Sequence, residues 1–286
     1  MSIGRTLIFF GAHPDDETFG PGATLAQYAN SGVKVYYVCA TRGEAGTVDQ
    51  TYKKGFARIA DLRTSEMLCA AKALGLTDVI FLGYRDSGMP GSRDNNDPDA
   101  LIAAPVDQVS GKMVKIIRQI KPDVIIAPDA GGGYGHPDHI AVHNAVVKAF
   151  YAANDPTQYK DAEPAFQPSK LYFTIRPHGF IKLAVRLMPL FGQNPRRFGR
   201  NKDIDLTKIA KEEYPVNAAI RLSRRAVRMQ HEASICHASQ GGAKPWAGIF
   251  RIVRSFESVG GARDFFMREF PEPLNRREKD LFEALK

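Results

Sequence analysis

The first half of the chain alternates short apolar runs with longer segments of helical periodicity, and this pattern restricts the fold more than any other feature. The runs are rich in β-branched and aromatic residues and predict strands at Thr6–Gly11, Val33–Ala40, Val79–Leu82 and Val124–Ala127. The segments that follow them predict helices at Gly22–Asn30, Gly55–Leu74, Val106–Gln119 and His139–Ala152. Successive strand-then-helix units form parallel strands through right-handed crossovers. We therefore expect an α/β fold, with a doubly wound and mainly parallel sheet in which the first strand is central.

The second half of the chain shows this alternation less clearly. After about residue 155, Lys170–Ile175 predicts one more strand, Asn217–Glu232 a helix and Glu278–Leu285 a terminal helix. Prolines punctuate the passage between the halves, but the sequence contains no long low-complexity linker. We expect a single domain over residues 1–286, with a Rossmann-like core at 1–155 and a C-terminal extension at 156–286.

Composition and cysteine usage limit the class of protein. The 286 residues are 44% hydrophobic and 24% charged, which is the balance of a folded globular chain. The cysteines Cys39, Cys69 and Cys236 are odd in number, far apart and in no CxxC pair, which argues against a disulfide framework and against a thiolate zinc site, and suits a reducing cytosol. Cys39 and Cys69 lie in apolar elements, so we expect both to be buried and inert. With no signal-peptide pattern and no apolar stretch long enough to span a bilayer, the sequence predicts a cytoplasmic protein.

The chain carries an excess of positive charge. Its 39 Lys and Arg against 31 Asp and Glu give a formal net charge of +8. The basic residues gather in a stretch over 180–202 and on the predicted helix near Arg221, Arg224, Arg225 and Arg228. No nucleic-acid-binding module accompanies them, so we expect solvated faces and no nucleic-acid partner. The stretch at 180–202 is also compatible with weak contact to a membrane surface, and an oligomer stays open.

A cluster of ionisable residues follows the first predicted strand. Gly11 leads directly into His13-Pro14-Asp15-Asp16, which places an imidazole and two carboxylates in one tight turn. Ligands of an open α/β sheet bind outside the carboxyl ends of its strands. Adjacent carboxylates in a partly desolvated pocket repel each other unless a cation lies between them. The cluster therefore indicates a metal site.

A similar cluster follows the fourth predicted strand. It contains Tyr134 and the run His136-Pro137-Asp138-His139. In a sheet of order 3-2-1-4, the first and fourth strands are neighbours whose crossovers leave to opposite sides. Either cluster alone would more often be a simple turn. Their positions at the two strands that flank this switch point predict that they face each other across one crevice.

The two clusters together supply a three-ligand metal site. His13, Asp16 and His139 offer two imidazoles and one carboxylate, which leaves a fourth position for water, as in catalytic zinc sites. His143 lies one helical turn after His139, but a fourth protein ligand would close the site, so we expect it to be no ligand. The remaining groups can act as acids, bases or hydrogen-bonding partners, as metal-assisted hydrolysis requires. They are Asp15, Tyr134, His136 and Asp138.

These residues resemble the signatures of a known family. AHPDDE at 12–17 and GHPDH at 135–139 are similar to the paired signatures of the PIG-L/LmbE-like zinc-dependent deacetylases, which remove acetyl groups from N-acetylglucosaminyl conjugates. Further matches in the family's order are TRGEAG at 41–46, Arg63 and Glu66, YRDSGM at 84–89, and HASQ at 237–240. YRDSGM and Tyr134 most resemble the branch with the mycothiol-pathway deacetylase and the mycothiol S-conjugate amidase. The resemblance covers roughly residues 5–150 and one C-terminal patch.

The resemblance implies a metal-dependent hydrolase that removes an N-acetyl group from an N-acetylglucosaminyl-type small molecule. Zinc would bind His13, Asp16 and His139, with Fe²⁺ or another divalent metal as alternatives. A water activated by the metal would attack the amide carbonyl, with Asp15 as its general base. The extension at 156–286 would complete the substrate pocket.

The resemblance also implies roles for the neighbouring residues. His136 would act as acid or oxyanion stabiliser, Asp138 would orient His136, and Tyr134 would lie near the carbonyl oxygen. Arg63 would bind substrate hydroxyls. Two further residues, Glu44 and Asp86, follow the second and third strands, where they would line the sugar pocket or cap their loops.

Three other functions remain open at this point. An amidase that cleaves a larger amide of a thiol-sugar conjugate would use the same residues. Two histidines and one carboxylate also describe the facial triad of non-haem iron enzymes, although those need a cosubstrate. A basic carbohydrate- or nucleic-acid-binding protein would need neither Asp15 nor His136, so we regard it as the weakest alternative.

Overall fold

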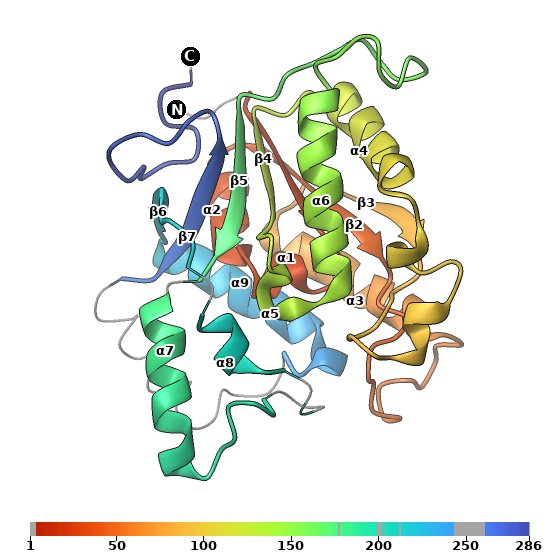
Figure 1. Ribbon diagram of the computed structural model, residues 1–286, viewed down its shortest axis with the longest axis vertical. Coiled ribbons are helices and arrows are strands. Elements are labelled where there is room, and N and C mark those ends of the chain that lie inside the picture. Colours follow the sequence, from red (N-terminus) through yellow and green to blue (C-terminus); the bar gives the residue numbers. More distant parts are fainter. Residues whose placement is uncertain are drawn as a thin grey trace.

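The structure is a computed structural model, and it describes residues 4–176, 178–198, 202, 204–211, 213–242 and 261–285 (Figure 1). One seven-stranded sheet in the order β3-β2-β1-β4-β5-β7-β6 runs through this part of the chain. Its strands are β1 Thr6–Gly11, β2 Lys34–Thr41, β3 Asp78–Tyr84, β4 Val124–Pro128, β5 Lys170–Ile175, β6 Ala218–Arg221 and β7 Arg263–Phe270. The strands β1 to β5 pair in parallel, and β7 pairs antiparallel with β5 and β6.

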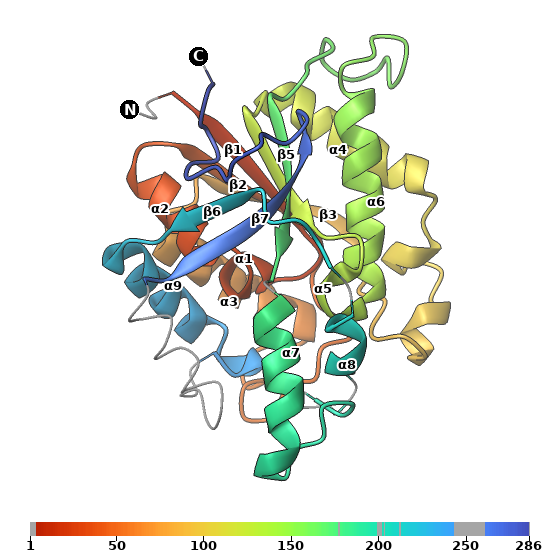
Figure 2. The ribbon, with the colours of Figure 1, turned by 60° about the vertical axis from the view of Figure 1, so that its left-hand side comes forward.

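Helices cover both faces of the sheet, as Figures 1 and 2 show. The longer helices are α2 Gly22–Asn30, α3 Ile59–Leu74, α4 Val106–Ile120, α6 Pro137–Ala152, α7 His178–Leu187 and α9 Arg224–Cys236. The short helices are α1 Asp16–Phe19, α5 Gly132–Gly135 and α8 Leu206–Ile209, with 3-10 turns at Arg93–Asn96, Leu101–Ala103, Met188–Phe191 and Ala238–Gln240. Helices α4 and α6 pack together on one face, and α2, α3 and α9 pack together on the other.

Strand β1 divides its side chains between these two layers. Ile8 and Phe10 belong to the apolar cluster under α4 and α6, whereas Leu7 and Phe9 belong to the cluster under α2 and α3. The strand is buried along its whole length because it is covered on both faces. Such coverage explains the continuous apolar run in the sequence. The predicted α/β fold, its strand order and its central first strand are confirmed.

The strands and helices of the first half lie close to their predicted positions. The main difference is the start of α3, which begins at Ile59 and not at Gly55. Gly55 has a φ of 88°, a left-handed conformation that no α-helix contains. Arg58 is extended and forms the N-cap, so the helix starts one residue later.

Two predictions for the second half are wrong. The segment Asn217–Glu232 is not one helix, because 218–221 form β6 and the helix α9 begins only at Arg224. The segment Glu278–Leu285 forms a bridge and turns, and no helix. The main chain of Glu278 bonds Asn217 and Ala219 at the edge of β6, which removes it from helical geometry.

The C-terminal strands join the same sheet as the first 155 residues. Strand β7 pairs with β5 and with β6, so the sheet continues without interruption into the extension. The carboxylate of Glu278 is 1% exposed and holds this region together through Lys170 (2.7 Å), Arg268 (2.9 Å) and the Tyr172 hydroxyl (2.7 Å). A buried carboxylate with three such donors is satisfied, as burial requires.

The cysteine prediction is wrong in one respect. Cys69 of α3 and Cys236 at the end of α9 form a disulfide, with Cα atoms 5.7 Å apart, and Cys69 lies at an exposed position. The two residues are 167 positions apart, and only the packing of α3 against α9 brings them together. Cys39 is free and buried, as predicted. Since disulfides persist mainly in oxidising compartments, the cysteines no longer support the cytoplasmic location expected from the sequence.

The basic stretch lies on the surface at the end of the molecule where the parallel strands end (Figure 1). It includes α7 and the turn after it, where Leu190 and Phe191 are 78% and 60% exposed beside the exposed Arg186. Arg200, part of the same predicted stretch, lies outside the described residues. Within the described part of the chain, no helix is long and apolar enough to cross a bilayer.

Candidate metal and active site

The turn after β1 fixes one carboxylate with main-chain amides. Asp16 begins α1, and its Oδ2 accepts the N–H of Ala12 (2.8 Å) and of His13 (2.9 Å). Its other oxygen, Oδ1, lies 3.3 Å from His139 Nε2. Burial alone would raise the pKa of Asp16, but His139 and His13 hold the pKa below its usual range. Asp16 is therefore held as an anion with one oxygen turned toward the histidines.

The loop after β4 orients the second group of residues by helix capping. His136 is the N-cap of α6, and its Nδ1 accepts the N–H of Asp138 at 3.2 Å. Pro137 occupies the first turn, where a missing N–H has no cost. This start of α6 turns His139 toward β1, so that His139 Nε2 lies 3.2 Å from His13 Nδ1. The two predicted clusters therefore meet at the carboxyl ends of the neighbouring strands β1 and β4.

Three donor atoms converge at this point. His13 Nδ1, a carboxylate oxygen of Asp16 and His139 Nε2 all lie within 4.8 Å of one another. Two imidazole nitrogens at this separation and one anionic oxygen are the ligand types of zinc and related divalent ions. The residues present thus fit the metal that the sequence predicts.

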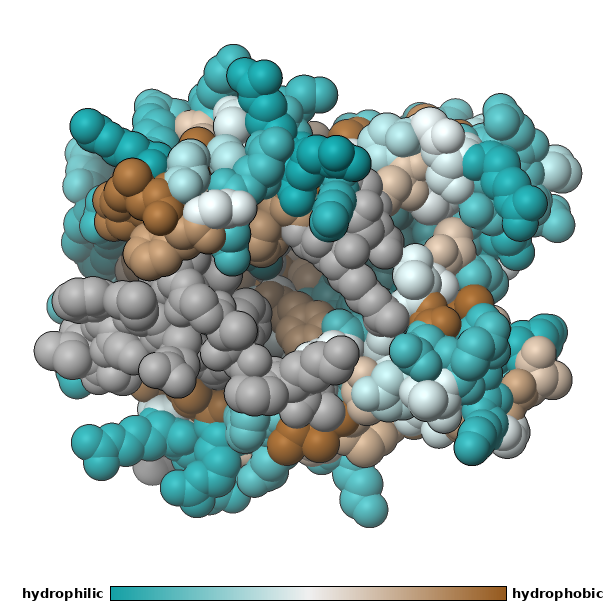
Figure 3. All heavy atoms as spheres, turned by 90° about the horizontal axis from the view of Figure 1, so that it is seen from below, coloured by the Kyte–Doolittle hydropathy of each residue, from teal (hydrophilic) through white to brown (hydrophobic). Residues whose placement is uncertain are grey.

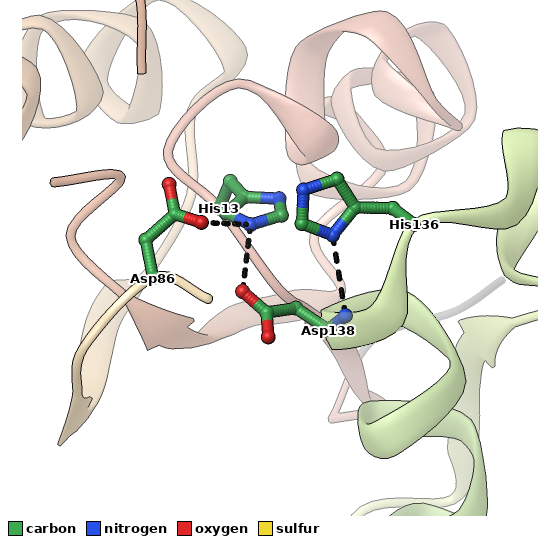
Figure 4. A group of neighbouring side chains, drawn as sticks. All are labelled: His13, Asp86, His136 and Asp138. Atoms are coloured by element: carbon green, nitrogen blue, oxygen red, sulfur yellow. Dashed lines mark hydrogen bonds and ion pairs between the residues drawn. The ribbon is translucent and has the colours of Figure 1, made fainter. Parts of the chain in front are cut away.

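Two buried carboxylates hold the other side of the His13 ring (Figure 4). His13 Nε2 lies 3.2 Å from Asp138 Oδ2 and 3.5 Å from Asp86 Oδ1. Carboxylates that face Nε2 favour the neutral tautomer with its proton on Nε2, and in that tautomer the Nδ1 lone pair points toward His139 and Asp16. Burial lowers the pKa of His13, but the acidic neighbours outweigh burial and raise the pKa well above its usual value. The proton and a cation therefore compete for His13.

The residues around Nε2 form a second group of donors. His13, Asp86, His136 and Asp138 are all buried and also lie within 4.8 Å of one another. In this group, however, His136 Nδ1 already accepts an N–H, and Asp138 Oδ2 accepts the Ser87 N–H at 3.0 Å. The group that includes Asp16 and His139 has fewer competing hydrogen bonds at its converging atoms.

Asp15 lies beside the donor group and contacts Arg63. Arg63 Nη2 donates to Asp15 Oδ2 at 2.9 Å and to the carbonyl of Pro14, and Nη1 donates to the carbonyl of Gly43. Burial raises the pKa of Asp15 to about 6, against the opposing effect of Arg63. Arg63 is 3% exposed, so the structure places it against Asp15 and the main chain instead of opening it to solvent.

His136 and Tyr134 both pack against the ring of His139. The Tyr134 ring makes edge contacts with His136 (centroids 5.8 Å apart) and His139 (5.4 Å). Burial and the nearby His13 and His139 lower the pKa of His136 to about 2. Burial raises the pKa of Tyr134 well above its usual value. Both are therefore neutral near pH 7 and can donate a hydrogen bond.

The contacts of Asp138, Glu44 and Asp86 can be compared with the roles predicted for them. The Asp138 side chain contacts His13, while only its main-chain N–H contacts His136. Glu44 Oε2 accepts the N–H of Arg42 and of Asp86, which is the loop-capping alternative. Asp86 accepts the Gly88 N–H at 2.8 Å and approaches His13.

Sequence reasoning did not identify a buried pair that joins α1 to the segment directly after α9. His237 Nε2 lies 2.7 Å from Glu17 Oε1, and both residues are fully buried. Ser239 donates to Glu66 of α3 through its N–H (2.8 Å) and its hydroxyl (2.7 Å). The signal was present in the matches at Glu17, Glu66 and HASQ, but nothing in the sequence shows which residue contacts which.

The surface at the carboxyl ends of the parallel strands is hollowed (Figure 3). A cavity of about 960 Å³ opens beyond Glu44, between the end of β3 and the start of α4. Its lining, as the structure describes it, includes Arg42, Tyr84 and Arg85 and none of the histidines of the donor group. Arg85 is already paired with Asp94 and Asp97. The cavity is thus a neighbour of the donor group and not its location.

Comparisons with known proteins show which family the chain resembles. The family model described as GlcNAc-PI de-N-acetylase, PIG-L, matches residues 8–150. A curated 1D-myo-inositol 2-acetamido-2-deoxy-alpha-D-glucopyranoside deacetylase of Streptomyces avermitilis is 38% identical over 301 residues, covering 98% of this chain and 97% of its own. The enzyme of the same name from Geodermatophilus obscurus is 33% identical over 249 residues, 84% of each chain.

Solved structures share the fold. The N,N'-diacetylchitobiose deacetylase of Pyrococcus horikoshii superposes with a TM-score of 0.62 at 21% identity, over 92% of this chain and 83% of its own. A deacetylase of teicoplanin biosynthesis superposes with a TM-score of 0.57 at 18% identity, over 92% and 97%. From the family match and the near full-length relatives, the chain belongs to the PIG-L family of GlcNAc-PI de-N-acetylases.

Proposed function

We propose that the protein is a metal-dependent hydrolase that removes the N-acetyl group of an N-acetylglucosaminyl-type small molecule. The observation that carries this proposal is the convergence of His13 Nδ1, Asp16 and His139 Nε2 beside Asp15 and His136. The two relatives with near full-length matches are named as deacetylases of a 2-acetamido-2-deoxy-glucopyranoside of inositol, which supports the substrate class.

The three converging donors would hold Zn²⁺, although the ligand types also accept Fe²⁺. When bound, a divalent cation polarises a carbonyl and lowers the pKa of water, so that hydrolysis proceeds near neutral pH. Asp138 and Asp86 would keep the proton of His13 on Nε2 and so keep Nδ1 available as a ligand atom.

Asp15 is the general base of the proposed reaction. Its carboxylate lies next to the ligand Asp16 and is held by Arg63 at 2.9 Å. A pKa raised to about 6 leaves Asp15 ionised at pH 7 and still basic enough to take a proton from the attacking water. The same raised pKa makes the protonated carboxyl able to return that proton to the amine that leaves.

His136 and Tyr134 stabilise charge on the carbonyl oxygen. His136 is neutral because its pKa is lowered to about 2, and its Nδ1 already accepts an N–H, so its Nε2 carries the proton. A neutral N–H donor of this kind, together with the Tyr134 hydroxyl, would bind the oxyanion that forms during attack. His136 thus acts as an oxyanion stabiliser, and Asp15 carries the transferred proton.

The extension at 156–286 completes the substrate pocket in this proposal, so that residues 1–286 form one catalytic unit. Helix α8 packs on α5, and the Tyr214 hydroxyl accepts the Gly131 N–H at 3.0 Å. The extension therefore touches the loop that carries Tyr134. Asp86 and Glu44 border the site from the other side, where Glu44 holds the main chain of Asp86.

Acetate release from N-acetylglucosaminyl-inositol and from diacetylchitobiose tests the proposal. The zinc-loaded protein should release acetate from at least one of them, and Asp15→Asn should lower kcat by about 10²- to 10⁴-fold with bound metal unchanged. Asp161→Asn, an exposed aspartate, serves as the matched control. The proposal fails if the wild type releases no acetate, or if Asp15→Asn is as active as the control. Cleavage of a larger acyl group alone would favour the amidase.

A further inference from the structure

Asp15 has a strained backbone. Its φ is 131°, a conformation that residues with a side chain rarely adopt. Such conformations persist only where surrounding contacts enforce them, and they gather at functional sites. The general base proposed above therefore depends on contacts that hold its main chain as well as its carboxylate.

The carboxylate of Glu17 supplies one such contact. Glu17 Oε2 accepts the N–H of Asp15 at 2.9 Å, and the Asp15 carbonyl accepts the N–H groups of Thr18 and Phe19. Glu17 is fully buried, so its charge requires partners of its own. Besides Asp15, its partners are the Thr18 hydroxyl and His237.

His237 is the partner of Glu17 that lies far from it in the sequence, 220 residues later. Its Nε2 lies 2.7 Å from Glu17 Oε1, and the imidazole is also fully buried. Its Nδ1 has no hydrogen-bond partner among the described residues, which favours the tautomer that donates from Nε2. The bond to Glu17 thus accounts for the orientation of the ring.

The segment around His237 is attached to the helix that holds the Asp15 carboxylate. Ser239 binds Glu66 through two hydrogen bonds, and Cys236 is bonded to Cys69. Glu66 and Cys69 lie on α3, as does Arg63, which binds Asp15 Oδ2. Residues 236–240 therefore fix α3 and the Asp15 turn relative to each other.

We propose that His237 is a positioning residue, which acts through Glu17 to hold Asp15 in its strained conformation beside the metal ligands. This inference rests on the proposed role of Asp15 as the general base. His237 belongs to neither donor group at the strand ends, so its loss should leave metal binding intact. A displaced base should lower the rate of the chemical step and leave substrate affinity unchanged.

The test compares metal-loaded, full-length variants by kcat, KM, bound metal and Tm. His237→Leu removes the N–H donor and should lower kcat by about 100-fold, the size expected for a displacement of about 1 Å. KM and metal content should stay at wild-type values. His237→Gln, which restores an N–H donor, should recover most of the rate. His231→Leu, the same change at an exposed position of α9, should have no effect.

A double variant separates positioning from a general loss of folding. Asp15→Asn with His237→Leu should be no slower than Asp15→Asn alone, because the positioned group is already absent. Multiplying effects, or a His237→Leu kcat within twofold of wild type, would overturn the inference. If Asp15→Asn itself keeps full activity, the proposed function fails instead.

A second variant covers the case in which His237→Leu does not fold. Glu17→Gln keeps the size of the side chain but leaves one accepting oxygen, so it cannot accept from both the Asp15 N–H and His237. It should lower kcat by about tenfold, the size expected for one charge-assisted hydrogen bond. Unchanged kcat, or a loss confined to KM, would contradict the inference.

Discussion

The loops after β1 and β4 and the segment after α9 contribute to the same site in different ways. The two loops carry the atoms that would bind metal and transfer protons, among them His13, Asp15 and His139. The segment 236–240 carries no such atom, yet it forms hydrogen bonds with the carboxylates of Glu17 and Glu66. The difference separates residues that react from residues that keep the reacting groups in place.

This division follows from the geometry of the sheet. Parallel strands bring their carboxyl ends to one edge, so short loops from distant parts of the sequence can share a crevice. The loops are short and polar, and one contains a strained residue, Asp15. Their conformation must therefore be fixed by buried contacts from another part of the chain.

Among the residues of the two loops that support a metal ligand, we expect replacement of Asp138 to have the largest effect on metal affinity. Asp138→Asn should weaken the hold on His13 Nε2 and lower metal affinity by about 10- to 100-fold, as loss of such partners commonly does. Metal titration by equilibrium dialysis measures the change, with exposed Asp161→Asn as control. Wild-type affinity in Asp138→Asn would show that the contact to His13 does not support the ligand.

The pH dependence of kcat/KM tests the proposed role of Asp15 as general base. A general base must be ionised, and the pKa of Asp15 is raised to about 6 by burial. Activity should therefore fall about tenfold per unit as the pH drops below about 6. Bound cation adds positive charge and can only move this limb to lower pH. A limb above pH 7, or none in a range where metal stays bound, would contradict the assignment.

We expect removal of the disulfide to have the smallest effect on activity. Cys69→Ser with Cys236→Ser opens a loop closed over 167 residues and should destabilise the fold by about 2–4 kcal/mol. Ser239 and His237 keep their own bonds to Glu66 and Glu17, so kcat of the folded variant should stay within about twofold of wild type. Denaturant unfolding and acetate release measure the two effects. A large fall in kcat at full metal occupancy would place the disulfide among the positioning contacts.

The sequence was sufficient for the parts of the fold that depend on local patterns. Strand β1 and helix α2 lie at their predicted bounds because periodicity and flanking glycines mark them locally. The two histidine clusters were predictable as one site because strand order follows from the handedness of the crossovers.

The remaining features depend on contacts between distant segments. Strand β6 has four residues, and β7 pairs with it in an antiparallel direction that no crossover rule predicts. Glu278 reads as the start of a helix, but buried Lys170 and Arg268 bind its carboxylate. The pairs Glu17–His237 and Cys69–Cys236 join positions 220 and 167 residues apart, and only the packed structure identifies them.

In the proposed site, the metal binds between the two strand-end clusters. Anomalous diffraction at the zinc edge, from crystals of the zinc-loaded protein, tests this claim directly. We expect one strong peak in contact with His13 Nδ1, Asp16 and His139 Nε2. A peak on the other side of the His13 ring, among Asp86, His136 and Asp138, would contradict it, as would no peak at either position.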